Sequence, residues 1–383
     1  MKIAMIIDAW DPIVWWWQVH VKNICEKLIK NHDCEIDLFV RALKWDDDKI
    51  YFKDETLFDW KLKIIRCGRP KLFFNFFERI LSIFSITLRV IKENKVKKYD
   101  LIHAHAFLWL LCWKISSLFL KIPIIWVSHW TNLLDKWEKN LYYFIENFLL
   151  TQIKYDILIW SWNNFLKYKN INKNISIIWN WVNIEEFEEV KFKKLDNIFK
   201  VLFVWRLEWT KWIDIFIESI NKIDRELLEK NKLQFHIVWY WYQENDYKKL
   251  VKNYDLEKYI LFRWKIVWKE LIKEYKTSNL FILPSRTEWF WITIIEALVS
   301  KVPVISTKCW WPEDIIKDWI NWFLIEKENS EELKNIIIKF ITWKIIDLEN
   351  IKQNWYDTVK NNYTWDIISD KIYNEYIKIR WSL

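Results

Sequence analysis

Short apolar runs alternate with longer amphipathic stretches along the whole chain of 383 residues. Apolar runs of roughly four to eight residues are typical of buried parallel strands, and apolar residues every three or four positions are typical of helices on a sheet. The pattern predicts strands at Lys2–Ile7, Glu35–Val40, Tyr99–His105, Ile122–His129, Asp156–Ser161, Val201–Val204, Gln234–Tyr242 and Val302–Ile305. Because strands and helices alternate on both sides of the charged stretch Glu185–Asn197, we expect an α/β fold with two Rossmann-like, doubly wound parallel sheets.

Two apolar runs, Leu72–Ile91 and Phe107–Trp126, approach the length of a membrane span. Charged residues inside them, among them Arg79 and Lys114, favour buried or amphipathic helices instead. The first run lies in the basic segment Arg66–Lys98. This segment predicts either a helix lying on an anionic membrane or an ordinary helix with its apolar face in the core.

Charge and cysteine usage narrow the class of protein. The net charge of +8 suits an anionic substrate or an acidic membrane surface and does not require nucleic acid. The five cysteines are scattered without CxxC spacing, which favours reduced thiols and a cytoplasmic location over disulfides or zinc. The first apolar run, Lys2–Ile7, is followed directly by the charged Asp8, so it predicts a strand and not a secretory signal.

Metal binding is not expected. The acidic run Asp46-Asp47-Asp48 could be a metal-binding DxD motif, but it does not follow an apolar strand. A solvated loop is the favoured interpretation.

The composition is unusual, because the chain has 1 Gly and 32 Trp. Glycine is normally about 7% of residues, so about 27 are expected in a chain of this length. An α/β protein needs glycine where the backbone takes positive φ. We therefore hypothesise that UGA codons encode glycine in the source organism and that they appear here as tryptophan.

The segment Phe203–Asp214 shows what this substitution changes. As printed it is FVWRLEWTKWID, and with glycine at each Trp it becomes FVGRLEGTKGID. A strand then leads through a glycine-rich turn into a helix, with Arg206 and Lys211 available to an anion. Glycine turns leave backbone N–H groups free, and a helix N-terminus favours negative charge.

Other segments change in the same way. When Trp15, Trp16 and Trp17 are read as glycine, Asp11–His20 becomes DPIVGGGQVH. When Trp289 and Trp291 are read as glycine, Leu283–Ala297 becomes LPSRTEGFGITIIEA. These segments resemble the glycine-rich donor loops of glycosyltransferase family 4, retaining enzymes with the GT-B fold. Across the chain, the tryptophans at family glycine positions are Trp15, Trp16, Trp17, Trp130, Trp181, Trp205, Trp212, Trp239, Trp241, Trp289, Trp291, Trp310, Trp311, Trp319 and Trp322.

The resemblance implies a reaction and roles for individual residues. A sugar passes from a nucleotide-diphosphate sugar to an acceptor hydroxyl with retention of anomeric configuration, without a bound metal or other cofactor. Arg206, Lys211, Glu288 and His129 are the implied catalytic residues, and Trp15, Trp16, Trp17, Trp205, Trp212, Trp289, Phe290, Trp291 and Glu296 are the implied donor-binding positions. Glu288 lies by the sugar, and Glu296 accepts hydrogen bonds from the ribose hydroxyls.

The resemblance also implies a domain plan. Residues 1–184 form the acceptor-side domain, 185–198 a linker, 199–362 the nucleotide-sugar domain, and 363–383 a helix that returns to the first domain. The acceptor is a glycan or a lipid-linked molecule, so peripheral contact with the inner face of the cell membrane is expected, and binding of nucleic acid is not. Two alternatives remain at this point: a GT-B phosphorylase, and a binding protein without activity if the tryptophans are real.

The histidines at predicted strand ends are weaker candidates. His129-Trp130, read as His-Gly, matches a recurrent motif of the family. His103 and His105 lie at the end of another strand, and His20 follows the first glycine-rich segment. For these three, packing within the domain competes with a role at the donor site.

Overall fold

A computed structural model of the chain divides into two compact units. The first unit combines Met1–Trp179 with Trp365–Leu383, and the second is Asn180–Thr364. The residues that the structure describes are 1–8, 10, 16–43, 54–71, 76–105, 110–128, 141–160, 172, 174–178, 181–192, 198–204, 212–239, 244–264, 266–286, 292–309, 323–342 and 348–381.

The first unit is built on a sheet of eight strands in the order β3-β4-β2-β1-β5-β6-β7-β8. All neighbours pair in parallel except β3 and β4, which form an antiparallel hairpin. The strands are β1 (Lys2–Ile6), β2 (Glu35–Leu43), β3 (Glu55–Leu57), β4 (Leu62–Lys71), β5 (Leu101–His105), β6 (Ile124–Ser128), β7 (Ile157–Trp160) and β8 (Ile175–Ile177). The central strands are apolar on both faces because helices cover both faces.

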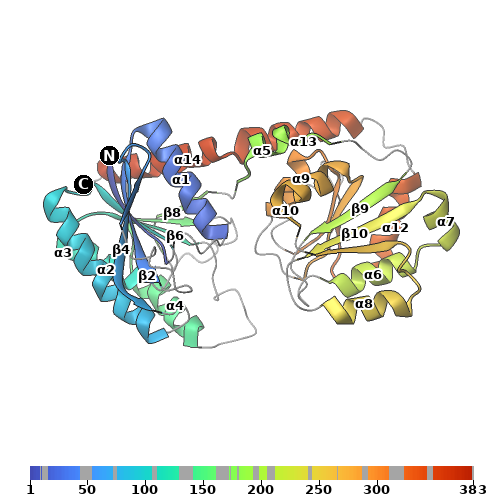
Figure 1. The fold of residues 1–383 in the computed structure, drawn as a ribbon, viewed down its shortest axis with the longest axis horizontal. Coiled ribbons are helices and arrows are strands. Elements are labelled where there is room, and N and C mark those ends of the chain that lie inside the picture. The colour runs from blue at the N-terminus through green and yellow to red at the C-terminus, as the bar shows by residue number, and fades with distance from the viewer. Residues whose placement is uncertain are drawn as a thin grey trace. The chain divides into compact units, whose positions relative to one another are not determined.

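Helices pack on both faces of this sheet (Figure 1). The chain passes from β1 to β2 in one direction and from β5 to β6 in the other, so right-handed crossovers place the connecting helices on opposite faces. The helices are α1 (Trp16–His32), α2 (Phe76–Val96), α3 (Leu110–Leu120), α4 (Leu141–Gln152) and α14 (Trp365–Trp381). The last helix packs beside α1, where Lys27 donates to Asp366 at 2.8 Å, and α2 packs beside α3.

The second unit has six parallel strands in the order β11-β10-β9-β12-β13-β14. They are β9 (Phe199–Val204), β10 (Leu233–Trp239), β11 (Ile260–Trp264), β12 (Leu280–Leu283), β13 (Val304–Thr307) and β14 (Phe323–Ile325). The helices are α5 (Ile184–Glu189), α6 (Ile213–Asn221), α7 (Arg225–Lys230), α8 (Glu244–Asn253), α9 (Trp268–Thr277), α10 (Ile292–Val299), α12 (Ser330–Thr342) and α13 (Leu348–Asn362). Together the two sheets confirm the predicted fold class of two Rossmann-like parallel-sheet domains.

The described residues of the two long apolar runs do not form spans. Residues of Leu72–Ile91 lie in α2, and Phe107–Trp126 contributes α3 and the beginning of β6. In the part of the chain that the structure describes, no helix is long and apolar enough to cross a membrane.

The stretch 185–198, predicted to be a linker, starts with the short helix α5. Phe187 of this helix is 1% exposed and meets the ring of Trp268 edge-on at 5.7 Å. The two compact units divide at 179/180 and at 364/365.

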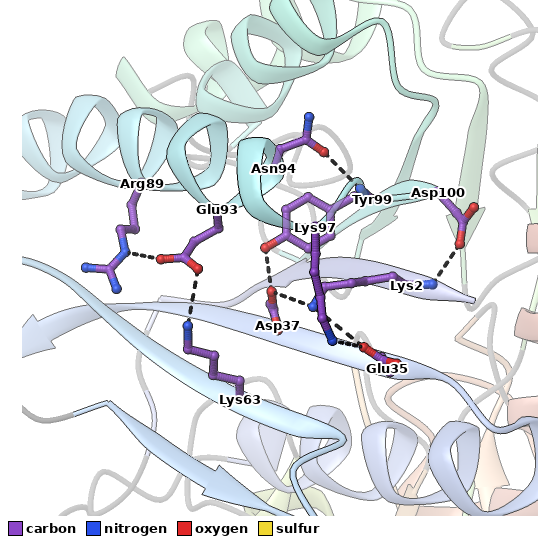
Figure 2. Close-up of polar contacts among 10 residues, drawn as sticks. All are labelled: Lys2, Glu35, Asp37, Lys63, Arg89, Glu93, Asn94, Lys97, Tyr99 and Asp100. Atoms are coloured by element: carbon purple, nitrogen blue, oxygen red, sulfur yellow. Dashed lines mark hydrogen bonds and ion pairs between the residues drawn. The ribbon is translucent and has the colours of Figure 1, made fainter.

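Polar side chains join the first residues of three strands in the first unit (Figure 2). The Tyr99 hydroxyl donates to Asp37 at 2.5 Å, and Lys2 Nζ lies 3.2 Å from the same carboxylate. The backbone N–H of Lys2 donates to Asp100 at 2.7 Å. Because Asp37 is buried, these partners offset the cost of removing its charge from water. They hold β2, β1 and the start of β5 in register.

Helix α2 is tied to this sheet by a second group of charges (Figure 2). Glu93 accepts from Lys63 of β4 at 3.2 Å and from Arg89 at 2.8 Å. Asn94 accepts from the backbone N–H of Tyr99 at 2.8 Å. The polar end of α2 is therefore fixed to the sheet, which sets the rotation of the helix about its own axis.

The second unit contains a buried charge cluster between α9 and the sheet. Glu274 of α9 lies 2.5 Å from Lys200 Nζ on β9 and 2.9 Å from His236 Nδ1 on β10. Burial by itself raises the pKa of Glu274, but the hydrogen bond with His236 and the charge of Lys200 outweigh it and lower the pKa to about 2. Burial lowers the pKa of Lys200 against the pull of Glu274. The ion pair therefore secures α9 to two strands.

Replacing Glu274 is expected to destabilise the second unit. Glu274→Gln leaves Lys200 buried without its opposite charge, and breaking such a pair costs about 3–5 kcal/mol of unfolding free energy. Chemical denaturation measures this loss. Glu229→Gln is the matched control, because its pair with Lys258 is exposed and is worth at most about 1 kcal/mol. Equal losses in the two variants would contradict the assignment.

The same pair predicts sensitivity to acid. The pKa of Glu274 is lower in the folded protein than its ordinary value of 4.5, so its stabilisation is complete above that pH and declines as the pH falls toward about 2. The stability difference between the wild type and Glu274→Gln should shrink over this range. Denaturation curves at several pH values test this, and a constant difference would count against the pair.

Candidate functional site

Two segments with implied donor-site residues start from neighbouring strands of the second unit. β9 ends at Val204, and β12, which ends at Leu283, pairs with it through Val201↔Leu280 and Leu202↔Phe281. In a parallel sheet the carboxyl ends of neighbouring strands meet at one edge, where ligands of open α/β sheets bind. The fold therefore brings together the ends of β9 and β12, from which the two segments that the sequence analysis expects to be glycine-rich begin.

The structure describes only some of the implied site residues. Those outside the described residues are Trp15, His129, Trp205, Arg206, Lys211, Glu288, Trp289, Phe290 and Trp291. The backbones of Trp16 and Trp17 lie in the first turn of α1, and their side chains are outside the described part. Trp212 and Glu296 are described completely.

Trp212 occupies a position suited to glycine. It is the N-cap of α6, with φ 45° and ψ 43°, in the left-handed region that costs an L-residue roughly 1–2 kcal/mol. Its side chain is 1% exposed, and its indole N–H has no hydrogen-bond partner within the described residues. A residue without a side chain would avoid both the backbone strain and the buried polar atom.

Arg286 connects the two segments, although the sequence analysis gave it no role. Its guanidinium carbon lies 5.1 Å from the centre of the Trp212 ring, so the residues after β12 touch the start of α6. Among the described residues, Arg286 forms ion pairs with Glu328 at 3.7 Å and with Asp214 at 3.9 Å. In the sequence, Arg286 lies three residues after β12 ends at Leu283. A cation so close to a strand end was the signal by which it could have been found.

The edge of the sheet is held by hydroxyl groups. The Thr307 hydroxyl at the end of β13 accepts from the Ser285 N–H at 2.9 Å and donates to the Ser285 carbonyl at 2.6 Å. Ser306 donates to the Leu283 carbonyl at 3.0 Å. All these residues are buried, so β12 and β13 end in a rigid arrangement from which the following segment begins.

Glu296 lies on α10, which begins after this segment. The helix is buried from Thr293 to Val299, and Glu296 is 6% exposed. Its Oε2 accepts from the hydroxyl of Tyr275 on α9 at 2.8 Å. Burial raises the pKa of Glu296 to about 7, against the opposing effect of the tyrosine hydrogen bond. This carboxyl is therefore near the balance between its neutral and charged forms at physiological pH.

Three histidines of the first unit, His20, His103 and His105, lie in its interior. His105 ends β5, His103 precedes it by two residues, and their rings stack at 4.3 Å. His20 of α1 meets His105 edge-on at 5.5 Å, and His103 Nδ1 is 2.5 Å from the hydroxyl of Tyr376 on α14. Each is at most 3% exposed. These contacts agree with the packing interpretation.

Within the described residues, His, Cys, Asp and Glu side chains form no group of three able to hold a metal ion. The acidic run Asp46-Asp47-Asp48 lies outside that part of the chain.

Two family models match the chain in succession. The Glycosyltransferase Family 4 model matches residues 18–186, and the Glycosyl transferases group 1 model matches residues 184–358. The second match contains β9, β12 and α10, and therefore the edge described above.

Individual proteins also resemble this chain over most of its length. An "Uncharacterized 41.2 kDa protein in cps region" of Klebsiella pneumoniae is 26% identical over 338 residues, which are 83% of this chain and 86% of that protein. Sucrose-phosphate synthase from Thermosynechococcus elongatus superimposes with a TM-score of 0.77 at 17% identity over 100% of both chains. Anabaena Alr3699/HepE, solved in complex with UDP-glucose, gives 0.70 at 16% identity, also over 100% of both chains.

At these identities the structural likeness shows the fold, and the family models add the class of reaction. The chain is therefore a glycosyltransferase of the GT-B type, which combines a Glycosyltransferase Family 4 domain with a Glycosyl transferases group 1 domain.

Proposed function

We propose that the protein transfers a hexose from a nucleotide-diphosphate sugar to a glycan or lipid-linked acceptor with retention of anomeric configuration. The observation that carries the proposal is the parallel pairing of β9 with β12, which brings the segments after both strands to one edge of the sheet. The contact between Trp212 and Arg286 joins those segments. The solved relative that holds UDP-glucose supports a donor of this class.

The proposed chemistry breaks the bond between the sugar C1 and the β-phosphate oxygen. The acceptor hydroxyl oxygen forms the new bond to C1 on the same face, and its proton passes to the departing phosphate. Negative charge grows on that phosphate, and we assign Arg206 and Lys211 to neutralise it. Glu288 binds the sugar, Glu296 the ribose, and His129 the donor phosphate or the acceptor. No metal or other cofactor is part of this proposal.

Glycine at many of the tryptophan positions is part of the same proposal. The hairpin between β3 and β4 supports it, because Phe58 (φ 52°), Asp59 (φ 51°) and Trp60 (φ 68°) all take positive φ. Asp59 and Trp60 are the central residues of a turn closed by a hydrogen bond from the Lys61 N–H to the Phe58 carbonyl at 3.0 Å. Two positive φ values define a type I′ turn, which strongly prefers Asp-Gly. Trp60 is 81% exposed, so packing does not explain a tryptophan there.

The other described positions divide into two groups. Trp212 takes positive φ, which glycine adopts without strain. The backbone does not take positive φ at Trp16, Trp17, Trp181 or Trp239. Glycine at those four positions is not required by φ. The case for glycine there rests on the pattern of the surrounding residues.

The surface of α2 supports contact with a membrane. Ile83, Ile86 and Val90 face the interior, but a second apolar stripe, formed by Leu81, Phe84 and Leu88, is 59–67% exposed. The exposed residues Lys92 and Lys95 continue this stripe by helical spacing. Exposed apolar side chains also lie on α3 and α4, which cover the same face of the sheet: Leu118, Phe119, Phe144 and Phe148.

A patch of this kind, with lysines at one end, fits an anionic lipid surface. We propose that the protein is cytoplasmic and binds the inner face of the cell membrane through this stripe, where a lipid-linked acceptor is available. The Klebsiella relative from a cps region supports a role in the synthesis of a cell-envelope polysaccharide.

A phosphorylase of the same fold is the competing enzyme class. It uses inorganic phosphate in place of a nucleotide and releases a sugar phosphate from a glycan. The two activities are distinguished by whether turnover requires a nucleotide sugar or inorganic phosphate.

Removing either proposed phosphate-binding cation should reduce transfer. Arg206→Ala or Lys211→Ala is expected to lower kcat by about 10²–10³-fold or more, because each removes positive charge from the departing phosphate. Release of nucleoside diphosphate from a panel of nucleotide sugars measures the rate. Lys230→Ala, an exposed lysine of the same unit, is the control and should keep the wild-type rate. Near-normal rates in both test variants would refute the assigned roles.

Recoding is tested directly by tandem mass spectrometry of the native protein. Peptides that cover positions 60, 205, 212, 289 and 291 should have the mass of glycine at each position, because the turns need positive φ or space for phosphate. Tryptophan at positions 205, 289 and 291 would favour the binding protein without activity.

Membrane binding is tested by sedimentation with vesicles. Replacing Leu81, Phe84 and Leu88 together by Asp should weaken binding to vesicles containing phosphatidylglycerol by at least about tenfold, because less apolar area is buried in the lipid. Val267→Asp, an exposed apolar residue of the second unit, is the control. Equal binding by the triple variant and the wild type would remove α2 as the contact.

A further inference from the structure

Glu296 is held by a single side chain from a neighbouring helix. The hydroxyl of Tyr275 donates to Oε2 at 2.8 Å, and within the described residues the structure records no hydrogen bond to Oε1. A carboxylate can accept hydrogen bonds at both oxygens. One oxygen is therefore occupied by the protein, and the other is available to a ligand.

Tyr275 is itself rigidly placed. Its side chain is fully buried, and its ring packs against Phe281 of β12 with the ring centres 5.6 Å apart. β12 is the strand from which the segment with Trp289 and Trp291, the second one proposed to contain glycine, begins. Tyr275 thus links Glu296 to the strand that carries the rest of the proposed donor site.

We propose that Tyr275 is a positioning residue for donor recognition, because its hydroxyl holds Oε2 of Glu296 and directs Oε1 toward the ribose hydroxyls of a nucleoside diphosphate. This inference rests on the proposed function, in which Glu296 binds the ribose. Tyr275 does not touch the donor. It acts by limiting the orientations of a buried carboxylate.

The hydrogen bond also affects the charge of the carboxylate. Ionised Glu296 is the better acceptor for hydroxyl groups, and the bond from Tyr275 favours the ionised form. Since burial raises the pKa of Glu296 to about 7, its charge changes within the physiological range. Affinity for a nucleoside diphosphate should therefore increase as the pH rises through neutrality, and loss of the tyrosine hydroxyl should move this increase to higher pH.

The experiment is calorimetric titration of the full-length protein with UDP, GDP and ADP, followed by the 2′-deoxy and 3′-deoxy forms of whichever binds most tightly. The wild type should bind the deoxy forms at least about tenfold more weakly, because a hydrogen bond to a charged acceptor is lost. Tyr275→Phe should weaken binding of the parent nucleotide by about tenfold or more and should discriminate less between it and the deoxy forms. The midpoint of its pH dependence should lie above that of the wild type.

Tyr259→Phe is the matched control, because it removes another tyrosine hydroxyl of the same unit that donates to a glutamate, Glu229, at 3.2 Å. Its affinity, discrimination and pH midpoint should equal those of the wild type. A double variant with Glu296→Ala separates positioning from general stability. In that background Tyr275→Phe should have little further effect on nucleotide affinity.

The outcomes separate the two levels of the hypothesis. A wild-type protein that binds none of the three nucleotides overturns the proposed function. A wild type that binds and discriminates, with Tyr275→Phe unchanged in affinity, discrimination and pH midpoint, overturns the inference alone. If Tyr275→Phe does not fold, Glu296→Gln replaces it: the pH dependence of affinity should then disappear, and its persistence overturns the inference.

Discussion

The parallel pairing of β9 with β12 is the contact on which the proposed donor site depends. The two strands are separated in sequence by β10 and β11, and their pairing at Val201↔Leu280 and Leu202↔Phe281 brings their carboxyl ends together. The segments that leave these ends contain the residues that the proposal assigns to the phosphates, the sugar and the ribose. The hydroxyls of Thr307 and Ser306 then fix β13 to the end of β12, so the edge is rigid where the donor segment begins.

Two buried glutamates in the second unit have pKa values shifted in opposite directions by their surroundings. Glu274 has a lysine and a histidine beside it, and its pKa is lowered to about 2. Among the described residues, Glu296 has a hydrogen bond from the tyrosine hydroxyl and no charged partner, and burial raises its pKa to about 7. The first is a permanent charge that secures α9 to the sheet. The second carries a perturbed pKa that does not favour stability, and such groups often belong to ligand-binding sites, in line with the role proposed for Glu296.

Backbone conformation supplies a second constraint. Left-handed residues at Asp59, Trp60 and Trp212 mark places where the chain must turn tightly, and glycine is the residue that does this without strain. The hairpin was not among the sequence segments first noted for glycine, so the positive φ of its residue Trp60 is separate support for recoding. At Trp181 and Trp239 the backbone makes no such demand, and there the case depends on the pattern of the surrounding residues.

The sequence by itself determined the alternation of strands and helices, the two parallel-sheet domains and the strand-end segments of the candidate donor site. These features follow from apolar runs and turn residues, which act over a few neighbouring positions. It could not determine the order of the strands, the contact of Arg286 with Trp212, the outward apolar stripe of α2, or the bond between Tyr275 and Glu296. Tyr275 and Glu296 are 21 residues apart on different helices, and nothing in the local pattern of either helix refers to the other. Only the tertiary structure decided these pairings, because burying a carboxylate is tolerated only where a distant part of the chain supplies its hydrogen-bond partner.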